Sequence, residues 1–170
     1  SSFNEVLLNK DNKKIKKFLK DLGYYFSKVD ISIEKLNDNK INLNYNISLG
    51  EKAKIKKISF IGEKIFKDKK LKGVILSEEY KPWKFLSGKK YLNESMIKYD
   101  ERLLKNFYLN KGYYNVIVNS SFAKLTEKQE FELIFNIDAN PKLFFGDLKL
   151  DLPSDFSETN YLDVQKFLKK

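Results

Sequence analysis

The sequence repeats itself at a shift of 89 residues, most visibly where the Gly-Tyr-Tyr segment at 23–25 recurs at 112–114. The apolar positions around this segment keep their order and spacing in both copies. One inserted residue then changes the shift to 90, after which the alternating run 41–47 matches 131–137. Solenoid repeats are roughly 20 to 50 residues long, so each of these longer copies is expected to be a small domain with its own core.

Each copy begins with the pattern of an amphipathic helix. Asn4 and Asn93 are good N-caps, and apolar residues at helical spacing follow each of them up to a glycine suited to the C′ position. After the first of these glycines, the period falls to two over 29–33 and again over 41–49, with a turn at 37–39 between the two runs. Such alternation on both sides of a short polar turn predicts a β-hairpin.

A further strand and a second helix complete the unit between the two copies of the long helix. Apolar alternation predicts the strand over 55–61, and a shorter helical pattern follows at 67–76. With the second hairpin, built from 116–122 and 131–137, the order of one unit is β-α-α-β-β. We expect an α+β fold in which two antiparallel helices cover a three-stranded mixed sheet whose third strand is parallel to its first. The expected core side chains are Ile58, Phe60, Leu104, Phe107, Val118, Leu133 and Phe135.

Both ends of the sequence are interpreted as falling inside such a unit. Residues 1–50 are expected to form the C-terminal part of one domain, its helix and hairpin, and residues 51–138 a complete domain. Residues 139–170 are expected to form the N-terminal strand and helix of the next domain. Because a natural chain is not expected to end within a domain, the sequence is interpreted as a piece of a longer protein.

The composition excludes most enzyme chemistry. Histidine and cysteine are absent, so the chain has no thiol nucleophile, no imidazole base, no disulfide and no zinc or haem ligand set. Asp11 and Asp100 recur at the same helix position without a base or metal-binding partner at a telling spacing, which favours hydrogen bonding within the domain. We therefore predict no enzymatic activity, no catalytic residue, no cofactor and no metal site.

The charge favours an anionic partner. The chain has 33 Lys and Arg residues against 23 Asp and Glu, a net charge of +10, which suits nucleic acid, an anionic lipid surface or an acidic protein. The lysines along the first helix support one hypothesis, a basic αβ nucleic-acid-binding module. Arg102 is the only arginine, however, and specific recognition of phosphates and bases favours the guanidinium group. Specific nucleic-acid binding is therefore disfavoured.

Three groups of residues occur in an order and spacing that a known family shares. They are Ile58-Ser59-Phe60-Ile61-Gly62 with Phe66, the loop Pro82-Trp83 followed by Gly88-Lys89-Lys90-Tyr91, and the run Asp100, Leu104, Tyr108 and Gly112-Tyr113. Together with the order β-α-α-β-β they resemble the POTRA, or polypeptide-transport-associated, family of tandem repeats, over essentially the whole chain. Within the loop, Trp83 is interpreted as an aromatic side chain folded onto its own domain.

The resemblance implies a function as well as a fold. It implies the periplasmic region of an outer-membrane protein assembly factor of a Gram-negative bacterium, anchored in full length by a β-barrel. The implied partners are unfolded outer-membrane protein segments, accessory assembly lipoproteins and neighbouring POTRA domains. A related translocation or two-partner secretion pore is an alternative, since it would share the fold and the mechanism but not the cargo.

The implied sheet also suggests where a partner binds. With the strands in the order first-third-second, the second strand is a free edge, and its unpaired N–H and C=O groups can pair with an extended peptide. Such β-augmentation depends little on sequence, which suits a surface that receives many unfolded strands. No lysine or proline guards the middle of this strand. The predicted partner-binding edge comprises Asn115, Val116, Ile117, Val118, Asn119, Ser120, Ser121, Phe122 and Ala123.

Overall fold

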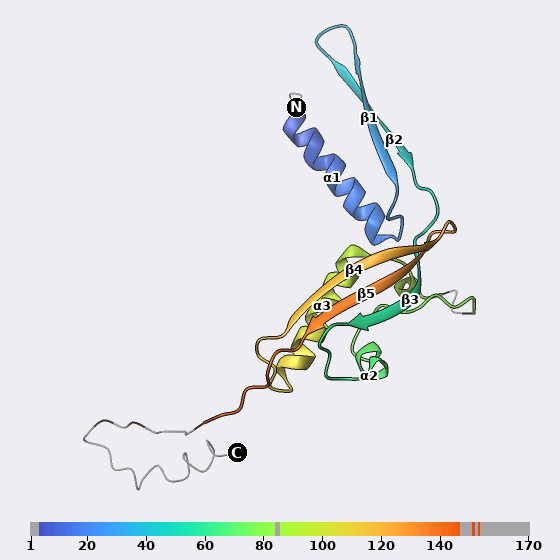
Figure 1. The fold of residues 1–170 in the computed structure, drawn as a ribbon. Helices are drawn as coiled ribbons and strands as arrows, with labels where there is room; N and C mark the ends of the chain where they lie inside the picture. Colours follow the sequence, from blue (N-terminus) through green and yellow to red (C-terminus); the bar gives the residue numbers. More distant parts are fainter. Residues whose placement is uncertain (1–3, 84–85, 147–150, 152, 154–170) are drawn as a thin grey trace.

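The computed structural model describes residues 4–83, 86–146, 151 and 153. These residues form a two-stranded hairpin sheet with one helix beside it, and a separate three-stranded sheet with its own helices (Figure 1). The elements follow in the order α1 (Glu5–Asp21), β1 (Lys28–Lys35), β2 (Ile41–Ser48), β3 (Lys54–Ile61), α2 (Asp68–Lys72), the 3-10 helix η1 (Gly88–Lys90), α3 (Glu94–Leu109), β4 (Ile117–Thr126) and β5 (Glu130–Asp138).

The two long helices begin where the sequence predicts. The side chain of Asn4 accepts the backbone N–H of Val6, and the side chain of Asn93 accepts the backbone N–H of Met96. Each of these bonds satisfies a donor that the first turn of a helix leaves without a partner. The helix α2 is shorter than its predicted span of 67–76, because it stops at the C-cap Gly73 and the chain then runs back beside β3.

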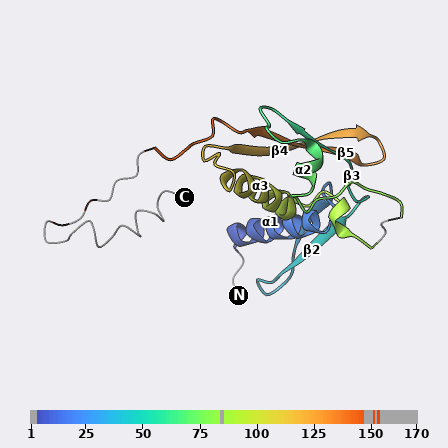
Figure 2. The same cartoon turned by 90° about the horizontal axis from the view of Figure 1, so that it is seen from below.

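The three-stranded sheet has the predicted topology. Its strand order is β3-β5-β4, with β5 parallel to β3 and antiparallel to β4. The helices α2 and α3 lie on the same side of this sheet (Figure 2). A strand can lie parallel to an earlier one only after a long crossover, and the chain between β3 and β5 supplies it. The predicted α+β fold with a mixed sheet is therefore confirmed.

The core lies between these helices and the sheet. Leu104 and Tyr108 of α3 are completely buried, and the ring of Phe60 in β3 stacks on that of Phe135 in β5 with centroids 5.6 Å apart. Burial on this scale is the main favourable contribution to folding. The predicted core side chains all take part in it: Ile58, Phe60, Leu104, Leu133 and Phe135 are buried, and Phe107 and Val118 pack against them half-buried.

The first copy of the pattern is far more open than the second. Leu43, Tyr45 and Ile47 of β2 expose 36 to 46% of their surface, whereas the matching residues of β5, Leu133 and Phe135 among them, expose at most 1%. In the second copy, β3 pairs with β5 and α2 covers the same core. The described part of the chain contains no counterpart of β3 and α2 for the first hairpin, so its apolar face stays in solvent.

The two copies meet at a junction built from hydrogen bonds. The carboxylate of Asp21, at the end of α1, accepts the backbone N–H and the hydroxyl of Ser95 in the first turn of α3, at 3.2 and 3.0 Å. The backbone C=O of Gly23 accepts the N–H of Ala53 at 3.0 Å. Gly23 has φ of +93°, and a Cβ atom there would lie 2.9 Å from the Cβ of Tyr91. The junction therefore requires glycine at this position.

Aromatic rings close the same junction. The ring of Tyr25 packs edge-on against Phe122 of β4, with centroids 4.8 Å apart, and Phe26 stacks on Phe131 of β5 at 5.1 Å. Both contacts join the loop after α1 to the β4–β5 hairpin, in geometries that aromatic pairs prefer. The first copy is thereby held against one end of the three-stranded sheet.

The junction hydrogen bond recurs one repeat later. The C=O of Gly112 accepts the N–H of Leu143 at 2.9 Å, and these residues match Gly23 and Ala53 of the first junction. Gly112 also has a positive φ, +89°. The strand and helix expected for the domain that begins at 139 fall largely on 147–150 and 154–170, which lie outside the described residues.

Candidate functional site: the open edge of the sheet

One edge of the three-stranded sheet, the outer side of β3, is closed by the protein's own chain. The C=O of Ile55 accepts the backbone N–H of Tyr80 at 2.6 Å, where the segment after α2 runs alongside the strand. Further along β3, the C=O of Phe60 accepts a hydrogen bond from the ammonium group of Lys64 at 2.6 Å. Backbone groups that already have partners cannot pair with an added strand.

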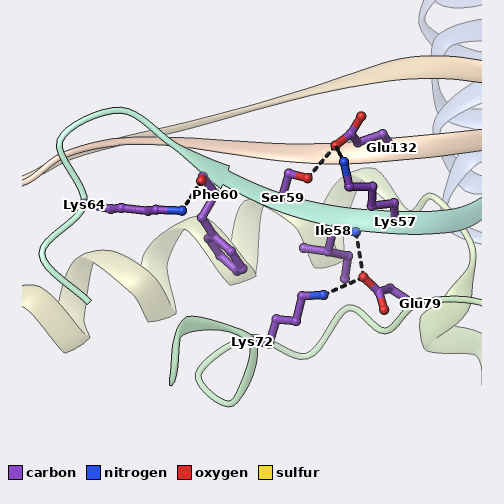
Figure 3. A network of polar contacts seen from close by, with 8 residues as sticks. All are labelled: Lys57, Ile58, Ser59, Phe60, Lys64, Lys72, Glu79 and Glu132. Atoms are coloured by element: carbon purple, nitrogen blue, oxygen red, sulfur yellow. Dashed lines mark hydrogen bonds and ion pairs between the residues drawn. The ribbon is translucent and has the colours of Figure 1, made fainter. Parts of the chain in front are cut away.

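A glutamate side chain closes the middle of the same edge. The carboxylate of Glu79 accepts the backbone N–H of Ile58 at 3.0 Å and the ammonium group of Lys72 at 2.6 Å (Figure 3). Partial burial by itself would raise the pKa of Glu79, but these two hydrogen bonds and the positive charge of Lys72 outweigh it and hold the pKa below its ordinary value. Glu79 is thus ionised at neutral pH and takes the place of a strand partner.

The other edge of the sheet, the outer side of β4, is open. Within the described residues, β4 exchanges backbone hydrogen bonds only with β5, in a register that runs from Ile117 opposite Asp138 to Thr126 opposite Glu130. In an antiparallel pair, alternate residues of an edge strand direct their N–H and C=O groups away from the partner strand. β4 therefore presents a row of backbone donors and acceptors that an extended peptide can use.

The side chains along this edge leave its backbone accessible. From Ile117 to Ala123 the strand carries no charged residue and no proline, and the small side chains of Asn119 and Ser121 stand on the outer face of the sheet. Edge strands that avoid pairing usually carry lysine, proline or a bulge in this position. The first charged side chain is Lys124, close to the register irregularity between Lys124 and Thr126.

A small hollow of about 200 Å³ lies beside the open edge. It is bounded by Ser120 and Phe122 of β4, by Ile97 near the start of α3 and by Tyr25 of the preceding copy. The hydroxyl of Ser120 donates to the carboxylate of Glu101 at 2.6 Å, which fastens β4 to α3 next to this hollow. A side chain of an added strand that points toward the helices would lie over it.

The outer face of the sheet carries ion pairs beside exposed apolar side chains. The carboxylate of Glu132 in β5 accepts the hydroxyl of Ser59 and forms an ion pair with Lys57 at 2.9 Å (Figure 3). These two interactions lower the pKa of Glu132. Lys56 and Glu130 form a second ion pair across the same strands at 3.3 Å. The face also exposes three apolar side chains, Ile61, Ile117 and Leu125. It is mixed rather than a continuous apolar patch, so the open edge is the stronger candidate site.

The structure corrects two details of the predicted edge. Asn115 and Val116 precede β4 and belong to the loop after Gly112. The C=O of Asn115 accepts a hydrogen bond from the side-chain amide of Asn140 at 2.9 Å, and Val116 is buried. The strand begins at Ile117 and continues to Thr126, three residues beyond the predicted end. The other predicted residues, from Ile117 to Ala123, all lie on the open edge.

Sequence reasoning missed the asymmetry between the two edges. Nothing in the local pattern around Glu79 shows that its carboxylate reaches a strand 21 residues earlier in the chain. The interpretation of Trp83 as packed on its own domain is wrong, since its side chain is 71% exposed.

Within residues 4–83, 86–146, 151 and 153, no cluster of three or more carboxylates is placed to hold a metal ion. Over the same residues, no helix is long and apolar enough to cross a membrane.

The β-α-α-β-β unit, its mixed sheet with one closed and one open edge, and the repeated junction define a class of protein that is built from tandem α+β repeats. Comparison with known families identifies it further: the family described as POTRA, surface antigen variable number repeat, matches residues 1–50 and 53–140. The chain therefore belongs to the POTRA family, whose members in this class of protein are non-enzymatic scaffolds.

Curated relatives narrow the class. The chain is 30% identical over 144 residues to the outer membrane protein assembly factor BamA of Buchnera aphidicola, an alignment that covers 83% of this chain and 23% of that protein. It is 23% identical over 167 residues to BamA of Neisseria meningitidis serogroup B, covering 98% of this chain and 21% of the relative. The chain thus spans less than a quarter of the length of these relatives, and its repeats are POTRA domains of the BamA type.

Solved structures show the same fold. BamA from Haemophilus ducreyi lacking POTRA domains 1–3 matches with a TM-score of 0.58 at 22% identity, over 81% of this chain and 24% of that one. POTRA domains 3–5 of BamA from Haemophilus influenzae match with a TM-score of 0.57 at 15% identity, over 96% of this chain and 62% of that one. POTRA domains of BamA lie in the periplasm, which is the compartment of the region described.

Proposed function

We propose that this POTRA region receives unfolded outer-membrane proteins by β-augmentation on the open edge of β4, from Ile117 to Ala123. An extended segment of the client adds to the sheet as a fourth strand beside β4. The observation that carries this proposal is the contrast between the two edges: β3 is closed by Tyr80, Glu79 and Lys64, and β4 pairs only with β5 within the described residues.

Backbone pairing suits clients of many sequences. An added strand pairs through its backbone N–H and C=O groups. Every residue except proline carries both groups, so the pairing depends little on the sequence of the client. Side chains of the client would alternate between the outer face of the sheet and the helix side, where Phe122 and Ile97 line the hollow together with Glu94 and Lys98. Strands of outer-membrane proteins alternate between apolar and polar side chains, because one face contacts lipid and the other does not.

The preceding repeat limits the edge at one end. Tyr25 packs on Phe122, so a client that pairs with β4 meets the first repeat near Phe122 and Ala123. The receiving stretch from Ile117 to Ala123 is seven residues long and ends beside this repeat. A short pairing region of this kind gives weak, reversible binding, since each backbone hydrogen bond contributes only about 1 kcal/mol net.

The arrangement of domains extends the same proposal. Residues 1–50 form the C-terminal part of one POTRA domain, residues 51–138 a complete domain, and residues 139–170 begin the next. The hydrogen bond from Leu143 to Gly112, which repeats the bond from Ala53 to Gly23, supports this division. Neighbouring POTRA domains are thus partners within the chain, and accessory assembly lipoproteins are proposed as external partners.

Paired proline substitutions test the binding edge. Adjacent residues of β4 alternate in whether their N–H group faces β5 or solvent, so one of Asn119→Pro and Ser120→Pro removes an outward donor. The outward substitution is expected to abolish binding of a labelled strand peptide while the melting temperature stays near that of the parent chain. The inward substitution destabilises the fold. Unchanged peptide binding in the stable variant would exclude β4 as the receiving edge.

A further inference from the structure

The segment between α2 and η1 exposes apolar side chains that have no core to join. Trp83 is 71% exposed and Leu86 is 90% exposed. In both views the chain at this point projects away from the sheet (Figures 1 and 2). The ammonium group of Lys81 lies over the Trp83 ring, 5.9 Å from its centroid. Single exposed apolar residues are common on protein surfaces, but here an indole ring and a leucine side chain lie three residues apart on one projecting segment.

Cationic side chains flank these apolar ones. Lys81 and Lys89 are both exposed and lie on either side of Trp83 and Leu86 in the sequence. The chain as a whole carries a net charge of +10, so its surface attracts anions from a distance as well. A projecting pair of apolar side chains between two lysines combines the two features of an interfacial membrane anchor: an amphipathic aromatic ring and nearby positive charge.

We propose that this projection, formed by Lys81–Trp83 and Leu86–Lys89, binds the surface of an anionic lipid bilayer. Trp83 and Leu86 enter the interface between the headgroups and the acyl chains, where an indole ring is well accommodated because it is apolar with one polar N–H. Lys81 and Lys89 lie at the level of the anionic phosphates. Charge complementarity favours an anionic bilayer over a neutral one, because a neutral bilayer would interact only with the two apolar side chains.

The inference goes beyond the function proposed for β4 and does not depend on it. The projection is separate from the open edge, because β3 and β5 lie between the segment after α2 and β4 in the sheet. Contact with lipid at Trp83 would leave the backbone of Ile117 to Ala123 free. A vesicle experiment can therefore succeed or fail without any change in the binding of peptides.

The chain contains a single tryptophan, so its fluorescence reports this projection alone. Vesicles of phosphatidylcholine mixed with phosphatidylglycerol are expected to shift the emission of Trp83 to the blue and to protect it from iodide. Vesicles of phosphatidylcholine alone are expected to cause a much smaller shift. Emission that is unchanged by both kinds of vesicle would overturn the proposal and leave the projection as a candidate contact for a protein partner.

Matched lysine variants separate this site from general charge. The double variant Lys81→Ala, Lys89→Ala is expected to lower partitioning onto the anionic vesicles about 25-fold, since each lysine near such a surface contributes about fivefold. The control pair Lys13→Ala, Lys17→Ala removes two exposed charges from α1 instead and is expected to change partitioning much less. An equal loss in both variants, or sedimentation with vesicles without a shift in Trp83 emission, would contradict the proposal.

Discussion

The buried carboxylate of Asp100 accepts the backbone N–H of Leu76 at 2.6 Å. Its second oxygen accepts the N–H of Ser77 at 3.1 Å, so one side chain of α3 fixes the segment that follows α2. That segment continues to Glu79 and Tyr80, which close the edge of β3. The recurring aspartate is therefore a structural residue that helps to define which edge of the sheet stays open.

Substitution of this aspartate tests the link. Asp100→Ala leaves the N–H groups of Leu76 and Ser77 without acceptors, the second of them buried, and is expected to lower the free energy of unfolding by about 3 kcal/mol. The matched control is Asp11→Ala at the equivalent position of α1, where the carboxylate is exposed and only faces Lys14 at 3.6 Å. The free energy of unfolding of Asp11→Ala should stay within about 0.5 kcal/mol of that of the parent chain. Urea unfolding followed by circular dichroism measures both, and equal effects would show that Asp100 has no special structural role.

The low pKa of Glu79 predicts how the closed edge responds to acid. Its hydrogen bonds lower the pKa in the folded state below the ordinary value of 4.5, so its contribution to stability is present above that value. The contribution is lost as pH falls through the lowered folded-state pKa. Glu79→Gln should cost about 1 kcal/mol at pH 7 and progressively less below the ordinary pKa. Unfolding measured along a pH series would contradict this if the difference between the two proteins did not shrink in acid.

Substitution of the junction glycine, Gly23, is expected to change how the two repeats are held together. Gly23→Ala forces a Cβ atom to 2.9 Å from that of Tyr91 at a positive φ, and should cost about 1 to 2 kcal/mol or displace the first repeat. Gly88→Ala is the control, because a Cβ there meets nothing within 4 Å. Spin labels at Lys16→Cys and Lys105→Cys report the angle, since the chain has no other cysteine. A distance distribution that is narrow and unchanged in Gly23→Ala would show that this contact does not set the junction.

Nucleic-acid binding, if measured, should follow lysine charge alone. Arg102 is the only arginine of the chain, and its guanidinium group lies over the ring of Tyr99 at 5.2 Å. We expect weak, sequence-independent binding of short duplexes that falls steeply as salt rises toward about 0.15 M. Fluorescence anisotropy at several salt concentrations measures this. Sequence-selective binding of nanomolar affinity at physiological salt would place the chain in a different functional class.

Much of the fold could be predicted because the pattern occurs twice. Asn93, Leu104 and Gly112 have counterparts 89 residues earlier, so the long helix and the hairpin were each indicated by two stretches of sequence. The alternation of Phe131, Leu133 and Phe135 predicted the strand β5, whose inward side chains are all buried, and its central place in the sheet was implied by the family resemblance. Local periodicity is enough to predict such elements, because apolar residues at a regular spacing lie on the same face of a helix or strand.

The details of the site depend on contacts that no local pattern records. Glu79 meets Ile58 only after the chain has reversed direction past α2, and a glutamate in a polar loop carries no signal of that partner. The start of β4 was misplaced by two residues because Val116 fits the strand alternation, although tight packing after Gly112 delays the strand. The sequence predicts that Trp83 folds onto its own domain, as an amphipathic aromatic ring usually does, but no local pattern shows whether neighbouring side chains receive it, and the residue is 71% exposed.

The most direct test of the account is an amide NMR titration of the isotope-labelled chain with an extended, amphipathic peptide from an outer-membrane strand. Ordering a solvated peptide for a handful of backbone hydrogen bonds predicts a dissociation constant of roughly 10⁻⁴ to 10⁻³ M. If the peptide adds beside β4, the shifted amides are expected to cluster between Ile117 and Ala123, and those of β3 are expected to stay unchanged. Shifts confined to the helices, to β3 or to Trp83, with β4 silent, would contradict β-augmentation at this edge.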